Sequence, residues 1–258
     1  MKEILKKIKN YQFLFEELVK RDFKTKYKGT WLGVLWSVLL PLMMFLVMRT
    51  VFIEFFGRTV SHYTTYLLAG YIVFNYYSDA TKSGMKSLRQ NARIIQKVNI
   101  PKFLFVLAKN VQVFISFLLN LLVFLIFVKI DDLHITWKFI TLLYPIVMLL
   151  MFNVGVGFLL SALYTFFRDM SYFYDVVVKL VSYMSAIFYN NKQYSLSVQY
   201  KFFINPIYCF IYYFRSVVID GIIPPMWLHA LIFFDALFVL SAGLYLYDRY
   251  NTRFLFYL

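Results

Sequence analysis

Side chains that commonly carry out catalysis are few and scattered in this chain. The three histidines, His62, His134 and His229, stand far apart, and the single cysteine, Cys209, has no second cysteine with which to form a disulfide within the chain. No glycine is followed directly by lysine, so the G-x-x-x-x-G-K-[ST] loop that cradles the phosphates of ATP is missing. We therefore expect no catalytic residue, cofactor or ATP site on this chain.

A metal site is also not expected. Asp131 and Asp132 are adjacent carboxylates, the kind of pair that can bind a divalent cation. Lys129 and Lys138 flank them, which favours a solvated loop, and no cluster of His and Cys is present.

Polar residues gather instead in two short stretches whose chemistry suits docking on another protein. Residues 82–102 hold six Lys or Arg and no acid, and their charge alone is also consistent with a simple membrane anchor. The amide side chains among them exceed what anchoring requires, which favours a short helix that docks in a groove of an acidic partner. A charged pair in a second, very short loop would contact the same partner. The candidate docking residues are Asn91, Arg93, Gln96, Lys97, Arg168 and Asp169.

Two pairs of tyrosines have a spacing that suits stacking on sugars. Tyr66 and Tyr77 are eleven residues apart, close to three helical turns, and Tyr172 and Tyr183 repeat the spacing. Each pair would share a helix face and could line a channel for a glycan. Tyrosine also concentrates at membrane interfaces and helix contacts, so the alternative that these tyrosines lie at such places and line no channel stays open.

The composition indicates the elements that must position these residues. Hydrophobic residues make up 61% of the 258 residues, aromatic residues 22% and charged residues only 16%. A water-soluble fold of this length has too little interior to bury so much apolar surface. We therefore expect an all-α integral membrane protein whose main solvent is lipid.

Six apolar segments are long enough to be spans, and an interrupted one precedes the last of them. We expect spans at 29–53, 64–80, 103–128, 139–164, 172–188 and 228–247. Asn205, Pro206 and Arg215 interrupt the apolar stretch 202–218. We interpret this stretch as re-entrant helices within an exterior gate region, 189–227.

Charged residues inside the expected spans lie nearer their ends than their centres. Arg49, Asp79 and Lys109 are expected to snorkel to the interface. Asp235 needs a partner, and Arg215 is the candidate by charge.

Charge also predicts the orientation. Residues 1–30 hold nine Lys or Arg against four acids, and with 82–102, 166–179 and 248–258 they carry +12. The alternating segments carry only +2. By the positive-inside rule both termini are expected in the cytoplasm.

Residues 1–28 are expected to form an amphipathic helix along the cytoplasmic membrane interface. Its apolar residues follow a three-four spacing, and its lysines lie on other faces where they can meet anionic headgroups. A soluble helix that packs on a partner remains the alternative. Gly29 would permit the turn into the first span, and Pro41 would kink that span.

Four motifs, in order along nearly the whole chain, resemble one family. They are YKGTWLGVLWSVLLPLMM (27–44), NARIIQKVNIPKFLFVLAKN (91–110), YTFFRDMSYFYDVV (164–177) and NPIY (205–208). The chain is similar in them to the membrane subunits of bacterial polysaccharide exporters of the ATP-binding-cassette type, which include O-antigen and teichoic-acid exporters. The chain departs from the family at SAIFYNNKQY (185–194). The family usually has a Thr-Pro or Ser-Pro there, and this chain has no proline, so the family's external gate shape is not carried over to it.

The resemblance implies a homodimer of six-span subunits in the bacterial cytoplasmic membrane, paired with two copies of a separate ATPase that bind ATP and Mg. It implies a cargo glycan on undecaprenyl pyrophosphate or a similar lipid, steered toward the first span by the N-terminal helix, and no nucleic-acid partner. The candidate residues for cargo access are Tyr27, Lys28, Gly29, Trp31, Trp36 and Pro41.

Two alternatives remain. One is an exporter subunit of the same architecture for a drug, a peptide or a free lipid. The other is a membrane-embedded glycan-modifying enzyme such as an acyltransferase, which would need a histidine or carboxylate cluster that the sequence lacks.

Overall fold

The computed structural model describes residues 11–56, 61–98 and 100–257, and within these ranges the chain contains helices and no strand. The expected all-helical class is confirmed. Three 3-10 turns, η1 (Gly33–Leu35), η2 (Trp137–Leu142) and η3 (Asn191–Gln193), connect some of the helices. The α-helices are α2 (Gln12–Tyr27), α3 (Trp36–Phe56), α4 (Tyr63–Gln90), α5 (Ala92–Lys97), α6 (Phe103–Ile130), α7 (Leu143–Phe166), α8 (Met170–Met184), α9 (Leu196–Phe202), α10 (Pro206–Val218), α11 (Met226–Tyr250) and α12 (Phe254–Tyr257).

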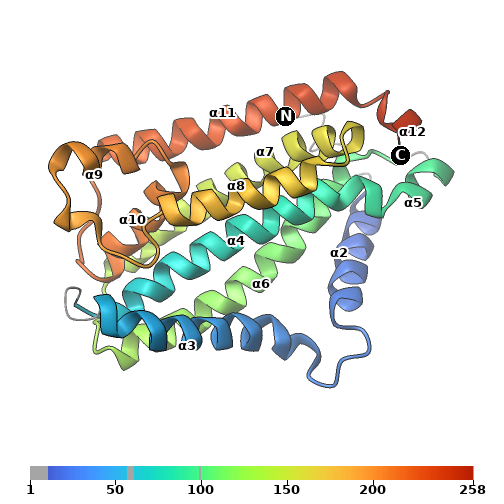
Figure 1. Cartoon of the computed structure of the whole chain (residues 1–258). Helices are drawn as coiled ribbons and strands as arrows, with labels where there is room; N and C mark the ends of the chain where they lie inside the picture. Colours follow the sequence, from blue (N-terminus) through green and yellow to red (C-terminus); the bar gives the residue numbers. More distant parts are fainter. Residues whose placement is uncertain (1–10, 57–60, 99, 258) are drawn as a thin grey trace.

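The long helices form a bundle whose centre is α4 and α7. α4 packs on both α6 and α7, and α7 packs on α11. α5 and α12 lie at one end of the bundle, called here the α5 end (Figure 1). α9 and α10 lie at the opposite end, the α9 end (Figure 1). α2 stands across the direction of the long helices near the α5 end (Figure 1).

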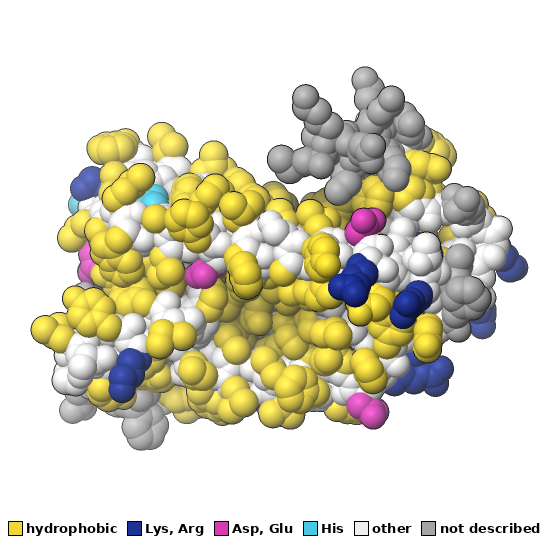
Figure 2. Space-filling view, turned by 90° about the horizontal axis from the view of Figure 1, so that it is seen from above, with side chains coloured by type: hydrophobic (Ala, Val, Ile, Leu, Met, Phe, Trp, Pro, Cys, Tyr) yellow, Lys and Arg dark blue, Asp and Glu magenta, His cyan; other side chains and the backbone are white. Residues whose placement is uncertain are grey.

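In the part of the chain that the structure describes, four helical segments are long and apolar enough to cross a membrane: Trp36–Glu54, Phe103–Ile130, Trp137–Phe166 and Met226–Tyr250. Seen from above, hydrophobic side chains cover most of the molecule, and Lys and Arg gather toward the α5 end (Figure 2). The expected spans 64–80 and 172–188 are not among the four segments. α4 carries many polar residues, and α8 has only 15 residues. Six spans therefore remains a prediction.

α4 is longer than the apolar run that predicts it. It continues to Gln90, ten residues past the expected end of the span, and most of its residues are buried. Polar residues such as Thr81 and Ser87 are fully buried in it. The first part of the expected docking segment 82–102 is thus a continuation of the central helix, and only α5 is a separate short helix.

Close helix packing depends on glycines. A Cβ on Gly155 of α7 would lie 2.6 Å from the backbone N and Cα of Leu240, and one on Gly243 of α11 would meet the backbone of Gly155. Helices can approach this closely in a membrane protein only where small residues face each other. These glycines explain how α7 and α11 pack backbone against backbone.

The expected ion pair between Arg215 and Asp235 is wrong. Arg215 is 7% exposed, and its Nε, Nη1 and Nη2 donate to the backbone carbonyls of Tyr66, Ala186 and Ile187 over 3.2, 2.9 and 2.9 Å. Its guanidinium also lies 3.4 Å from the centre of the Tyr66 ring. Carbonyl dipoles and an aromatic face therefore stabilise this cation, and they join α10 to α4 and to the turn after α8.

Candidate functional site at the junction of α2, α4 and α5

Asn91 connects the end of α4 to the start of α5. It is 3% exposed, and its backbone carbonyl accepts from the N–H groups of Ile94 and Ile95 at the start of α5. Its side-chain Nδ2 donates to the Ser87 carbonyl in the last turn of α4 over 2.8 Å. Asn91 thereby satisfies backbone groups on both sides of the bend, and this fixes the direction in which α5 leaves the bundle.

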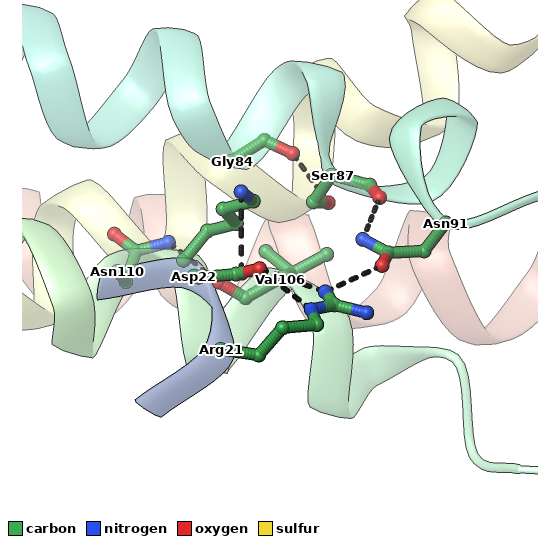
Figure 3. Close-up of polar contacts among 8 residues, drawn as sticks. Arg21, Asp22, Gly84, Ser87, Asn91, Val106 and Asn110 are labelled. Atoms are coloured by element: carbon green, nitrogen blue, oxygen red, sulfur yellow. Dashed lines mark hydrogen bonds and ion pairs between the residues drawn. The ribbon is translucent and has the colours of Figure 1, made fainter. Parts of the chain in front are cut away.

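Arg21 of α2 binds the remaining polar atom of the same side chain. Arg21 Nη2 donates to Asn91 Oδ1 over 2.7 Å and to Asp22 Oδ1 over 2.7 Å, and Arg21 Nε also donates to Asp22 Oδ1 over 3.1 Å. Figure 3 shows Arg21 lying between the Asp22 carboxylate and the Asn91 amide. The orientation of α5 therefore depends on α2 through one guanidinium.

Asp22 fastens α2 to α6. It is 8% exposed, and its Oδ2 lies 3.2 Å from the Nζ of Lys109, whose side chain is 17% exposed. Leu18, one turn earlier on α2, is also buried, so apolar packing accompanies the ion pair. α2 therefore has one buried face that is joined to the bundle, whereas Phe13 is 79% exposed. Residues 1–10, which hold the first part of the expected amphipathic helix, lie outside the described residues.

Two glycines bring the three long helices together beneath this junction. A Cβ on Gly84 of α4 would lie 2.9 Å from the Cα of Gly157 on α7 and 3.3 Å from the Nδ2 of Asn110 on α6. Asn110 itself is fully buried, and its Nδ2 donates to the Val106 carbonyl over 3.0 Å (Figure 3). Because neither backbone can shift without the other, the junction rests on a closely packed base.

The structure divides the candidate docking residues into one buried anchor and an exposed set. Asn91 is buried, so it positions α5 and does not itself offer a surface. Ile95 of α5 is 4% exposed, so one face of α5 packs against the bundle. The exposed candidates at this end of the bundle are Arg93, Gln96 and Lys97 on α5 and Arg168 and Asp169 in the turn between α7 and α8.

The candidate residues for cargo access lie at the end of α2, in the following loop and in the first part of α3. Gly29 has a φ of +79°, a conformation that favours glycine, so the expected turn is present. Lys28 is exposed, Trp31 is 97% exposed and Trp36 is 38% exposed. Pro41 lies inside α3. Tyr27 ends α2, and its side chain is outside the described residues.

A cleft of about 540 Å³ opens between α3, α4 and α6. Each helix contributes polar groups to it, among them Ser37, Asn75 and Asn120, and apolar and aromatic side chains also line it. Sequence patterns did not connect these three residues, because they lie far apart along the chain and only Ser37 belongs to one of the four motifs.

The two tyrosine pairs have different environments. Tyr66 and Tyr77 are 8% and 6% exposed inside the bundle, where the Tyr66 hydroxyl donates to the Tyr189 carbonyl over 2.8 Å. Tyr172 and Tyr183 are 76% and 67% exposed on α8. A channel formed on the surface of this subunit would therefore meet the second pair and not the first.

Sequence reasoning missed the contacts that organise the junction. Lys109 was expected to snorkel, but it forms an ion pair with Asp22, the only acid between residues 18 and 53. That isolated acid in a basic stretch is the signal that would have predicted the contact. Arg49 likewise donates to Thr64 Oγ1 over 2.9 Å and joins α3 to α4.

Two further observations complete the α5 end. Lys102 Nζ donates to the Asn251 carbonyl over 2.7 Å, and burial lowers the pKa of Lys102. Among the described residues no group of three or more His, Cys, Asp or Glu is placed to hold a metal ion.

Comparisons with known proteins identify the relatives of this chain. The family model described as ABC-2 type transporter matches residues 14–219. The chain is 24% identical over 250 residues to an O-antigen export system permease protein RfbA of Klebsiella pneumoniae, which covers 95% of this chain and 96% of the relative. It is 23% identical over 191 residues to a protein of the same name from Myxococcus xanthus, which covers 73% of each chain.

Proposed function

The chain belongs to the ABC-2 type transporter family, and we propose that it is the channel-forming membrane subunit of an ATP-driven exporter of lipid-linked polysaccharide. The cargo would be an O-antigen, a teichoic acid or a related cell-surface glycan. The observation that carries this proposal is the similarity to an O-antigen export permease over 95% of this chain and 96% of that protein.

The proposed exporter contains two copies of this chain and two copies of a separate ATPase, which binds ATP and Mg. The exposed side chains of α5 and of the turn at Arg168 and Asp169 are the proposed contacts with the ATPase. Support comes from the geometry of the junction. Asn91 and Arg21 hold α5 in place, so a push on α5 would be transmitted to α2 and α4 together.

The α5 end is proposed to face the cytoplasm of a bacterium, with both termini on that side. The excess of positive charge in residues 1–30 and 82–102 supports this orientation. Reporter fusions after Lys20, Ser87 and Asn251 should report cytoplasm, and fusions near His62, His134 and Asn191 should report the exterior. A single inverted signal within this series would contradict the six-span topology.

The proposed cargo is carried on undecaprenyl pyrophosphate or a similar lipid. It would approach along the membrane surface by the loop between α2 and α3, where Trp31 is almost fully exposed. The exposed pair Tyr172 and Tyr183 on α8 offers aromatic faces to sugar rings once two subunits enclose a channel. Aromatic faces accept many sugars because stacking does not require one hydrogen-bond pattern.

The decisive experiment is reconstitution with the proposed partner ATPase. Purified exporter in proteoliposomes should hydrolyse ATP faster when lipid-linked glycan is added, and glycan should become accessible outside. The chain alone should hydrolyse no ATP. Stimulation by a drug, a peptide or a free phospholipid, with no response to lipid-linked glycan, would overturn the proposed cargo.

A further inference from the structure

A groove of about 470 Å³ lies between α7, α11 and α12 at the α5 end. It is separate from the junction of α2, α4 and α5, and none of its lining residues belongs to the docking or cargo-access residues described above. Two of its walls are the helices α7 and α11, which are both long and apolar enough to cross a membrane. We therefore expect a groove between these two helices to meet lipid along its length.

The lining of the groove changes in chemistry along the helices. Leu159, Leu163 and Leu246 supply apolar walls on α7 and α11. Phe166 lies seven residues after Leu159, which places it about 10 Å further along the helix axis. There Phe166 contacts Tyr250 and Tyr257, with ring centres 5.5 and 4.9 Å apart.

The groove ends at a cation. Arg253 lines it, with its guanidinium carbon 5.8 Å from the centre of the Tyr250 ring, and its side chain is exposed. Of the described residues that line the groove, none is acidic. The groove thus has an apolar wall, then an aromatic belt and then a positive charge. A bilayer has the matching order, from its apolar core through the interface to the headgroups.

We propose that this groove binds an anionic phospholipid, with an acyl chain against the leucines and the phosphate at Arg253. The hydroxyls of Tyr250 and Tyr257, which also line the groove, can donate further hydrogen bonds to phosphate or glycerol oxygens. A choline headgroup would also suit an aromatic site, but the arginine repels its quaternary ammonium. An acidic peptide would suit the arginine but would leave the apolar wall without a matching chain.

This inference goes beyond the proposed transport function and does not depend on it. Native mass spectrometry of the delipidated full-length chain in detergent provides the test, with titration of phosphatidylglycerol or phosphatidylcholine of identical acyl chains. We expect one phosphatidylglycerol per chain to bind before any further lipid does, and with higher affinity than phosphatidylcholine. Arg253→Gln should raise the apparent Kd for phosphatidylglycerol about fivefold, as expected for one basic residue near a membrane surface.

Arg249→Gln is the matched control, because it removes the same charge from the same end of the chain. Arg249 donates to the Tyr245 hydroxyl and does not line the groove. Leu163→Trp should fill the apolar part and weaken phosphatidylglycerol while Arg253 is intact. Elution volume and thermal unfolding confirm that each variant is folded.

Three outcomes would overturn the proposal. Equal affinity for the two lipids would show that the groove does not select a charge. Equal losses in Arg253→Gln and Arg249→Gln would reduce the effect to general surface electrostatics. Displacement of the bound lipid when the ATPase is added would instead assign the groove to a protein contact.

Discussion

The side-chain amide of Asn120 on α6 donates a hydrogen bond to the backbone carbonyl of Ser37 on α3 over 3.3 Å. That carbonyl lies four residues before Pro41, which has no N–H to complete the usual helical hydrogen bond. Asn120 thus supplies the donor that the proline lacks, in the cleft between α3, α4 and α6. α3 is tied to its neighbour at the point where its own ladder is interrupted.

A double-mutant cycle tests this relationship. Asn120→Ala should lower the stability of the purified protein by about 1 kcal/mol, the value of a typical hydrogen bond. For a protein of this size that corresponds to a fall in Tm of about 2–4 °C. In a Pro41→Ala background the alanine N–H can serve the Ser37 carbonyl, so Asn120→Ala should cost less. Equal losses in Tm in the two backgrounds would refute the relationship.

Two glycines only two residues apart on α7 should differ in their tolerance of a methyl group. Gly155→Ala places the Cβ 2.6 Å from backbone atoms of Leu240, which cannot move without displacing α11. Gly157→Ala meets side-chain atoms first, at 3.1 Å from Asn110 Nδ2 and 3.4 Å from Val106 Cγ1. We expect Gly155→Ala to lose several degrees of Tm or to fail to purify as a single species. Gly157→Ala should be milder, and the reverse order would contradict the packing.

The sequence was sufficient to predict the helical class, the turn at Gly29 and most of the apolar helices, because those features depend on composition and local periodicity. It did not predict the end of α4. The apolar run stops near residue 80, but the helix continues to Gln90 because its later polar residues face a protein interior rather than lipid. Hydropathy indicates which segments prefer lipid to water, but it does not show which polar residues are buried against other helices.

Contacts between distant residues were the least predictable part of the candidate site. Arg215 was paired with Asp235 on charge alone, but its acceptors are backbone carbonyls, which every residue carries and no sequence pattern marks. Asn91 was assigned to the docking surface because it lies in a polar motif. It is buried, and one of its hydrogen-bond partners is Arg21, seventy residues earlier in the chain.

Arg215 should be far more sensitive to substitution than Asp235. Arg215→Met would leave the carbonyls of Ala186 and Ile187 without the Arg215 donor, at a cost of about 1–3 kcal/mol for each group left unsatisfied. Ala186 has a φ of +47°, so the turn it belongs to depends on such outside support. Asp235→Asn should change Tm little. Comparable losses of Tm in both variants would instead support an ion pair between Arg215 and Asp235.

The exposed face of α5 should respond to charge by position and not by total. Arg93→Glu places a reversed charge at the proposed ATPase contact, which at a partly buried contact costs a few kcal/mol and weakens assembly about 100-fold. Arg168→Glu should act similarly, because it also puts a like charge beside Asp169. Lys86→Glu is the control, since Lys86 lies on α4 near Asp175 of α8 and not on α5. Co-purification of the ATPase gives the measurement, and equal effects of Arg93→Glu and Lys86→Glu would reduce the segment to an anchor.

The hydrogen bond between Arg21 and Asn91 should matter for coupling to the ATPase, although neither residue is a proposed contact with it. Arg21→Met and Asn91→Leu each remove the hydrogen bond that holds α5 to α2, so each should reduce ATP hydrolysis stimulated by cargo more than it reduces binding of the ATPase. Both variants lose the bond between Arg21 and Asn91, so the loss in the double variant should be smaller than the sum of the two single losses. Lys24→Met, an exposed change on the same helix, is the control and should keep full stimulation. Additive losses in the double variant would mean that the two residues act independently and that α2 does not position α5.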